Sequence, residues 1–342
     1  HPVGNVGLPT AQQNDCFVAK ATRRSLISGV ASTAFYYCLP TSIANAAELN
    51  LNPPKRRGRN SGVSRDSEAL LQTESICFVT NRREATEASI GNRFTTMRGD
   101  LAFGKAKVVV FRPRFRGDYS RQRVGSVSTI PKNVFLASLL SKVGGQDKPI
   151  NFFVHGYATS WLEAVTSAAQ LRSDIQSNNV MVAFCWSSHE SVLGYVADQD
   201  EIEWCQDQMR EVLLDLLRLS DDVIVNVIAH SLGARGVMGV LRAIYRSGDR
   251  EQLKKIREVV FAAPDVEQER MDRDYLPVAK FAGFNTTVYV SDKDVAMSVS
   301  ESLHRRPRVG SASGKIYIHQ QVATIDVSVS DESRWGHSAL FR

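Results

Sequence analysis

The sequence predicts an α/β fold in which helices flank a mainly parallel central sheet. From Ser75 onward, short apolar runs alternate with amphipathic stretches, which is the pattern of strands and helices that follow one another along the chain. Of the 342 residues, 43% are hydrophobic and 23% are charged, the balance of a globular protein with a sizeable core. No apolar run reaches the roughly 18 to 20 residues that span a bilayer, so no transmembrane segment is expected.

The expected strands are short runs of apolar, β-branched and aromatic residues. Such runs are typical of strands that are buried on both faces of a parallel sheet. The run 222–229 (DVIVNVIA) is the clearest, and 149–154 (PINFFV) combines β-branched with aromatic residues. The complete set, in chain order, is 76–80, 107–111, 149–154, 180–186, 222–229, 258–262, 286–290 and 323–327.

The expected helices carry apolar residues at every third or fourth position, which places those residues on one face. In the stretch 207–219, five apolar side chains form one such stripe. The other expected helices are 133–143, 162–172 and 233–245. The last of them begins directly after the strand 222–229, so the sequence predicts a strand-to-helix junction there.

The clearest chemical signal lies at this junction. It reads Ala229-His230-Ser231-Leu232-Gly233, a G-x-S-x-G pattern with Ala in the first small position. The residues two before and two after the serine must be small, because larger side chains would collide across a sharp turn. Such a turn lifts the serine hydroxyl above the edge of the sheet. We therefore expect Ser231 to be a nucleophile; the alternative is a packing turn of small residues.

A nucleophilic serine needs two backbone N–H groups aimed at the developing oxyanion. The residue after the nucleophile, Leu232, supplies one of them. The run 152–157 (FFVHGY) is a strand followed by His-Gly-X, which is the expected form of the loop that supplies the other. We expect Tyr157 to donate that second N–H, and His155 to brace the loop rather than to act as a base.

The base must lie late in the chain and reach the serine from a loop. His337 follows the last expected strand and a short loop, which is the required place, whereas His230 adjoins the serine and points away from it. The acid that orients the base should follow a late strand, and two aspartates meet this condition. Asp294 is the favoured candidate and Asp265 the competing one.

These pieces together resemble the α/β-hydrolase superfamily, and within it an uncharacterised bacterial esterase/lipase-like branch with a domain of unknown function. The resemblance extends over residues 76–337 and implies an α/β-hydrolase fold and a Ser-Asp-His triad in that chain order. The blocks that carry it are Val79-Thr80-Asn81-Arg82, Phe153-Val154-His155-Gly156-Tyr157, Phe184-Cys185-Trp186-Ser187, Ala229-His230-Ser231-Leu232-Gly233, Ala262-Ala263-Pro264-Asp265, Tyr289-Val290-Ser291-Asp292-Lys293-Asp294 and Trp335-Gly336-His337-Ser338.

The function that these residues predict is hydrolysis of carboxylic esters, with Ser231, Asp294 and His337 as catalytic residues and the amides of Tyr157 and Leu232 as the oxyanion hole. We expect a small-molecule or lipid-like ester as substrate and no cofactor. Two alternatives stay open: a thioesterase, acyltransferase or amidase on the same triad, and a binding protein that kept the fold but lost catalysis.

The start of the chain has the layout of an export signal. Arg23 and Arg24 precede a moderately apolar stretch at 26–39, and small residues follow at 44–46, as in a cleavable signal of the twin-arginine type. A short amphipathic helix is the alternative. We expect residues 1–47 to be this signal-like segment, 48–70 a flexible basic linker and 71–342 the catalytic domain, exported to the periplasm or the exterior of a bacterium.

Charge and cysteine content exclude several other classes of function. The net charge is +6, but the basic residues fall in separate clusters without a zinc-finger or RNA-binding signature, so no specific nucleic-acid partner is expected. The five cysteines form no C-x-x-C motif and no His/Cys cluster. We therefore expect neither a bound metal nor a disulfide framework.

Overall fold

The structure is a computed structural model, and it describes residues 19–20, 70–86, 88–112, 121–144, 148–175 and 178–328. Apart from residues 19, 20 and 70, the predicted export segment and linker therefore lie outside the described residues. The predicted base, His337, lies outside them as well.

Ten strands in the described part of the chain form one sheet. They are β1 (Ala19–Lys20), β2 (Leu70–Glu84), β3 (Phe94–Arg112), β4 (Arg121–Ile130), β5 (Ile150–Val154), β6 (Val180–Cys185), β7 (Val225–His230), β8 (Ile256–Ala262), β9 (Asn285–Val290) and β10 (Ala323–Asp326). Their order is β1-β10-β9-β8-β7-β5-β6-β2-β3-β4. Neighbours are parallel except for the pairs β2–β3 and β3–β4, which are antiparallel, so the predicted mainly parallel sheet is confirmed.

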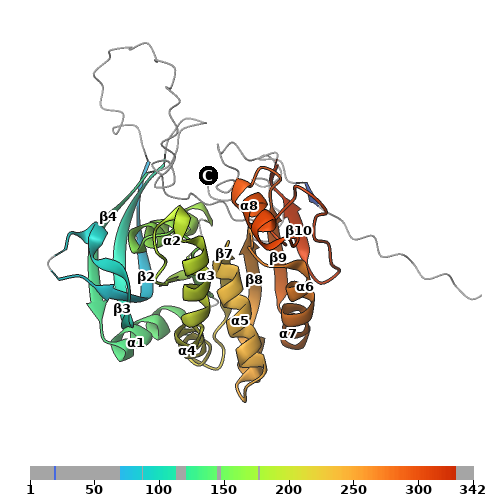
Figure 1. The fold of residues 1–342 in the computed structure, drawn as a ribbon. Helices are drawn as coiled ribbons and strands as arrows, with labels where there is room; N and C mark the ends of the chain where they lie inside the picture. The colour runs from blue at the N-terminus through green and yellow to red at the C-terminus, as the bar shows by residue number, and fades with distance from the viewer. Residues whose placement is uncertain are drawn as a thin grey trace, which may run out of the picture.

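Helices cover both faces of this sheet (Figure 1). They are α1 (Lys132–Val143), α2 (Trp161–Ile175), α3 (Tyr195–Trp204), α4 (Gln206–Leu217), α5 (Gly233–Tyr245), α6 (Gln268–Arg270), α7 (Leu276–Ala282) and α8 (Val295–His304). One core cluster joins α2 to one face, and a larger cluster joins α1, α4, α5 and α7 to the other. The neighbours Phe152 and Phe153 in β5 belong to different clusters, because side chains alternate between the two faces of a strand.

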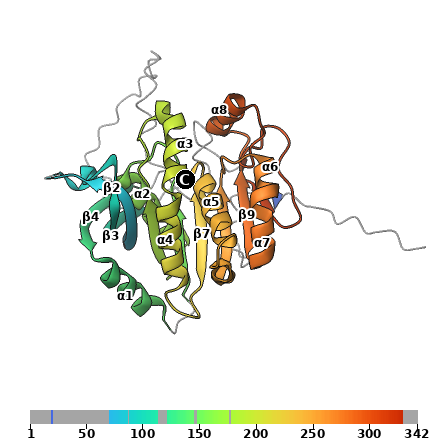
Figure 2. The ribbon, with the colours of Figure 1, turned by 60° about the horizontal axis from the view of Figure 1, so that its bottom comes forward.

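Several elements were not predicted, among them the edge strand β4 and the helices α3, α7 and α8. The edge strand β4 alternates exposed with half-buried residues, so it lacks the apolar run of a central strand. Helix α8 packs little against the core, because only Met297 and Ser300 are buried in it. Helices α3 and α8 lie at the same end of the sheet (Figures 1 and 2). No helix among the described residues is both long and apolar enough to cross a membrane.

Candidate active site

Ser231 occupies a sharp turn between β7, which ends at His230, and α5, which begins at Gly233. Its φ is 49°, in the left-handed region that a non-glycine residue adopts only when the surrounding structure enforces it. The end of β8 holds this turn on both sides. The amide of Ser231 donates to the carbonyl of Ala262 at 2.9 Å, and its carbonyl accepts from the amide of Asp265 at 3.2 Å. The strand, strained turn and helix expected around Ser231 are therefore present.

The loop after β5 packs directly against this turn, and two glycines allow the close approach. A Cβ on Gly233 would lie 2.4 Å from the carbonyl oxygen of His155. A Cβ on Gly156 would lie 2.7 Å from Nδ1 of His230 and 3.0 Å from Cβ of Ser231. Contacts this short exclude any side chain, so only glycine fits at both positions without a shift of its neighbours.

The two residues expected to donate oxyanion N–H groups lie on these abutting segments. Leu232 precedes the first residue of α5 and has helical φ and ψ of −62° and −27°. Its amide is therefore one of the N–H groups that a helix start leaves without an intrahelical partner, at the positive end of the helix dipole. Tyr157 follows Gly156 in the loop that touches Ser231. The structure thus brings both predicted segments beside the serine.

The hydroxyl of Ser231 has unused hydrogen-bonding capacity. The residue is only 1% exposed, and its Oγ has no hydrogen-bond partner in the part of the chain that the structure describes. Buried hydroxyl groups are paired in most proteins, because an unpaired one loses its bonds to water without replacement. A buried serine hydroxyl without a partner among the described residues, on a turn with a left-handed φ, is suited to act as a nucleophile.

His155 braces the loop 155–160 between β5 and α2, which we call the oxyanion loop after its expected role. Its ring stacks on that of Trp186 with centroids 5.0 Å apart and planes 3° apart, and Nδ1 lies 2.7 Å from the carbonyl oxygen of Gly156. The indole Nε1 of Trp186 donates to the carbonyl of His155 at 2.9 Å. Burial, together with the positive charge of Arg82, lowers the pKa of His155 to about 3. The imidazole is therefore neutral near pH 7 and suits a packing role.

Both candidate acids are buried at the carboxyl edge of the sheet. Asp294 follows β9 and caps α8, where its Oδ1 accepts a hydrogen bond from the amide of Met297 at 3.0 Å. The pKa of Tyr157 is raised, mainly by burial of its phenol. The negative charges of Asp294 and Asp265 raise it further. The two acids therefore both lie near the oxyanion loop.

Asp265, in contrast, is engaged in a buried network between β8, α3 and α8. Its Oδ2 accepts from the hydroxyl of Tyr195. Its Oδ1 accepts from the hydroxyl of Ser300 at 2.6 Å and lies 3.3 Å from Nε of Arg308, whose side chain is 3% exposed. Both oxygens of Asp265 are thus bound to partners that join three elements, which is the arrangement of a structural carboxylate.

Sequence reasoning assigned no role to Asp198, which anchors the oxyanion loop from α3. Its Oδ2 accepts from the amide of Ala158 at 2.9 Å and from the hydroxyl of Ser188 at 2.6 Å. Its Oδ1 accepts from the amide of His189 at 2.7 Å and lies 2.9 Å from Nδ1 of the same residue. Ala158, the residue after Tyr157, has a φ of 51°. Asp198 therefore stabilises a strained backbone next to the expected oxyanion donor.

Arg82 is the second anchor of this loop. Its side chain is 0% exposed, and it donates to the carbonyl of Thr159 at 2.5 Å and to that of Trp186 at 2.9 Å. Its charge is paired with Glu190 at 2.7 Å. Arg82 lies in one of the blocks that carried the family resemblance, but nothing in the sequence indicated this role.

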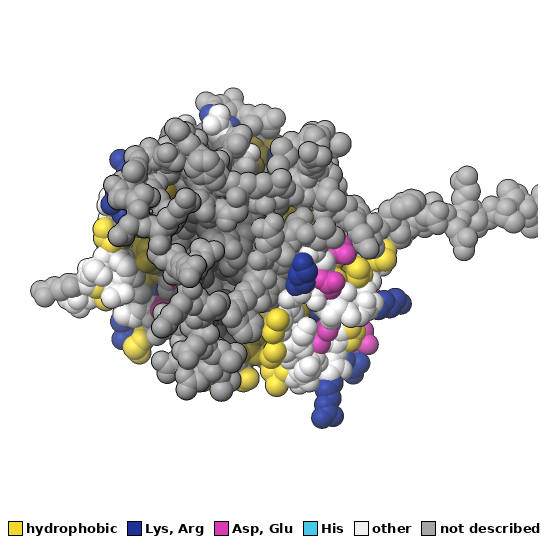
Figure 3. Space-filling view, turned by 90° about the horizontal axis from the view of Figure 1, so that it is seen from above, with side chains coloured by type: hydrophobic (Ala, Val, Ile, Leu, Met, Phe, Trp, Pro, Cys, Tyr) yellow, Lys and Arg dark blue, Asp and Glu magenta, His cyan; other side chains and the backbone are white. Residues whose placement is uncertain are grey.

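No group of three or more His, Cys, Asp or Glu side chains that could hold a metal ion occurs among the described residues. Seen from the end at which α8 lies, the described acidic and basic side chains lie interspersed (Figure 3).

Solved structures show only a weak likeness to this chain. TT1662 from Thermus thermophilus is 12% identical, with 68% of this chain and 89% of that chain covered and a TM-score of 0.35. The naproxen esterase of Bacillus subtilis is 10% identical, with 80% and 89% covered and a TM-score of 0.33. An esterase from Rhizomucor miehei is 14% identical, with 75% and 74% covered and a TM-score of 0.32. A search of curated protein sequences finds no match.

A family model gives a clear match. The family described as "Alpha/beta hydrolase of unknown function (DUF900)" matches residues 134–333, which is more than half of the chain. The match includes β5 to β10 and the turn at Ser231. The predicted superfamily and fold class are confirmed: this chain belongs to the alpha/beta hydrolases of unknown function, the DUF900 family.

Proposed function

We propose that this chain is a serine hydrolase that cleaves carboxylic esters through an acyl-enzyme on Ser231. The observation that supports this most strongly is the state of Ser231 itself. It combines a left-handed φ of 49° with a buried hydroxyl that has no partner among the described residues. A protein gains no stability from either feature, so their presence at a strand-to-helix turn favours a chemical role.

In the proposed reaction, the hydroxyl oxygen of Ser231 attacks the ester carbonyl while His337 takes the hydroxyl proton. The amides of Leu232 and Tyr157 stabilise the negative charge on the carbonyl oxygen. The alcohol then leaves with the proton from His337. Water hydrolyses the acyl-enzyme by the same steps and releases the acid, so no cofactor is needed.

We assign Asp294 the role of orienting His337 and stabilising its charged form. One observation supports Asp294 over Asp265. Both oxygens of Asp265 bind side chains, those of Tyr195, Ser300 and Arg308, whereas Oδ1 of Asp294 binds a backbone amide, that of Met297.

Hydrolysis of a panel of p-nitrophenyl esters, with a thioester and an amide beside them, tests the proposal. Wild-type protein should hydrolyse at least one ester, and Ser231→Ala should lower kcat by several orders of magnitude. Ser247→Ala is the matched control, because Ser247 lies just past the far end of α5, where its hydroxyl bonds the carbonyl of Ile244 at 2.8 Å. Equal activity of the wild type and Ser231→Ala would overturn the proposal, and turnover of the thioester or amide alone would reassign the substrate class.

Export remains part of the proposal and is tested separately. Replacing Arg23 and Arg24 together with Lys should retain the protein in the cytoplasm if the segment is read as a twin-arginine signal. Unchanged fractionation of the double variant would contradict this.

A further inference from the structure

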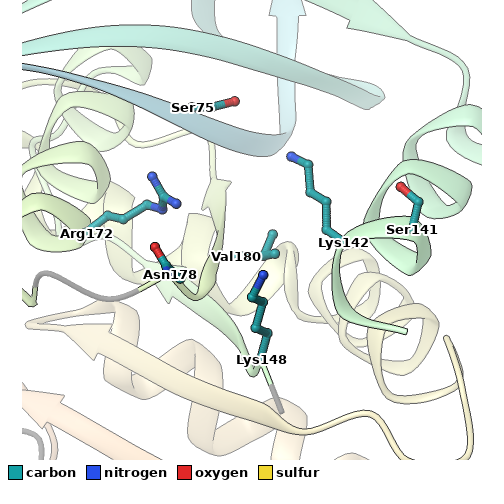
Figure 4. A pocket seen from close by; sticks show the side chains of 7 residues that line it. All are labelled: Ser75, Ser141, Lys142, Lys148, Arg172, Asn178 and Val180. Atoms are coloured by element: carbon teal, nitrogen blue, oxygen red, sulfur yellow. The ribbon is translucent and has the colours of Figure 1, made fainter. Parts of the chain in front are cut away.

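A polar cavity of about 270 Å³ is lined by residues that the proposed ester hydrolysis does not involve (Figure 4). Val180, the first residue of β6, forms part of its wall. The cavity is therefore at the amino ends of the parallel strands, whereas Ser231 follows the carboxyl end of β7. Nothing in the proposed ester hydrolysis uses it.

Three cationic side chains, two from helices and one from a loop, reach into this cavity (Figure 4). Lys142 belongs to the last turn of α1, and Arg172 to the last turn of α2. Lys148 lies two positions before β5. The neutral lining groups are the hydroxyls of Ser75 and Ser141 and the side-chain amide of Asn178.

The positive charge in the cavity is only partly balanced. Arg172 is paired with the buried carboxylate of Glu74, and its Nε donates to the carbonyl of Asn179 at 3.1 Å. Neither Lys142 nor Lys148 has a carboxylate within 4.0 Å in the described part of the chain. Two of the three cations therefore have no anionic partner there.

The thiol of Cys77, beside Lys142, does not balance this positive charge either. The ammonium of Lys142 lies 4.0 Å from Sγ of Cys77. Burial raises the pKa of this thiol, and the charges of Lys142, Lys105 and Arg172 oppose that rise without reversing it. Cys77 is thus neutral near pH 7, and its surroundings contain a fourth nearby cation, Lys105.

We propose that this cavity binds an oxyanion, and that the ligand class is phosphate, either free or as the phosphate group of a small molecule. Two ammonium groups that have no carboxylate partner among the described residues converge with a guanidinium and neutral donors, which matches an acceptor group with several charged oxygens. A concave site concentrates the field of such cations. The volume exceeds that of a bare phosphate ion, so it accommodates a small organic group attached to it.

Isothermal titration calorimetry on the full chain tests this site, with sodium phosphate and glycerol 1-phosphate as ligands and sodium chloride at matched ionic strength as the blank. Both ligands should bind to the wild type, and tighter binding of glycerol 1-phosphate would identify a phosphorylated small molecule as the source. Lys142→Ala and Lys148→Ala should each weaken binding about tenfold. Lys142→Arg, which keeps the charge, should bind within about threefold of the wild type.

Lys280→Ala, at an exposed lysine of α7, is the matched control for loss of one positive charge and should bind like the wild type. Circular dichroism melting without ligand verifies that each variant is folded. The inference is independent of ester hydrolysis, so Ser231→Ala should also bind phosphate normally. It is overturned if the wild type gives no heat beyond the chloride blank, or if the folded Lys142/Lys148 double variant binds with unchanged affinity.

Discussion

The carboxylate of Asp198 gives the sharpest quantitative prediction, because it can be replaced by an isosteric amide. Oδ2 accepts two hydrogen bonds and Oδ1 accepts one from the amide of His189, with the ring nitrogen also in reach. In Asp198→Asn, one oxygen becomes an NH2 group, which donates and cannot accept. Whichever way the amide turns, its NH2 group faces a backbone N–H, that of Ala158 or that of His189, and this hydrogen bond is lost.

The cost follows from the burial of this side chain, which is 0% exposed. A hydrogen bond to a charged group contributes about 1.5–3 kcal/mol, and an unsatisfied buried donor costs about 1–3 kcal/mol. Asp198→Asn should therefore lower the free energy of unfolding by about 3 kcal/mol. The amide of Ala158 is the neighbour of the proposed donor Tyr157, so the oxyanion geometry should loosen as well. Loss of a whole oxyanion donor costs about 100-fold to 1000-fold in kcat, and partial misplacement should cost about 10-fold to 100-fold.

Steady-state kinetics on a p-nitrophenyl ester, paired with urea unfolding, separates the two effects. We expect kcat to fall while KM stays within about twofold, because the loop positions the transition state rather than the ground state. Asp200→Asn, at an exposed position two residues along the same helix, is the matched control and should behave like the wild type. A folded Asp198→Asn protein with wild-type kcat would refute the positioning role.

Three further predictions concern the site and its loop. Gly156→Ala places a Cβ 2.7 Å from Nδ1 of His230. It should lower kcat at least tenfold in an ester assay, and it should lower the free energy of unfolding by about 1–3 kcal/mol in urea unfolding. Asp294→Asn should lower kcat by about 10⁴ in a protein that unfolds like the wild type, whereas Asp265→Asn should lose mainly stability, as urea unfolding would reveal. The folded pKa of His155, about 3, lies below its ordinary value of 6.5, so the unfolded chain binds an extra proton between these values. The contribution of His155 to the free energy of unfolding is fully present above about pH 6.5 and falls by about 4 kcal/mol as the pH drops toward 3. Urea unfolding of His155→Gln at the same pH values should lack this decrease.

The central strands were predictable because burial on both faces leaves a continuous apolar run. β5 is buried at all five positions and β7 at all six, and both had been expected from such runs. The edge strand β4 could not be recognised in this way, because six of its ten residues are polar and none is buried. Helix α8 was missed as well, because half of its ten residues are polar and only Met297 and Ser300 are buried. Hydrophobic pattern reports burial, so elements with little buried surface stay hidden from it.

The same division applies to the site. The turn at Ser231 was predictable because its demand for small residues acts within a few residues of the chain. Gly156 was predictable from the strand followed by His-Gly-X, although the contacts that require a glycine there come from His230 and Ser231. The anchors of the loop were not, since Asp198 bonds an amide 40 residues away and Arg82 a carbonyl 77 residues away. Partners so distant in sequence are brought together only by the folded sheet. His337 lies outside the described residues, so its role stays a prediction.

The most direct test of the central proposal is to find where a covalent intermediate forms. Wild-type protein is incubated with a fluorophosphonate, digested, and the adduct located by peptide mass spectrometry. The proposed mechanism predicts one adduct, on the hydroxyl of Ser231, and none in Ser231→Ala. An adduct on another residue, or ester hydrolysis that continues at the wild-type rate after Ser231 is fully modified, would contradict it.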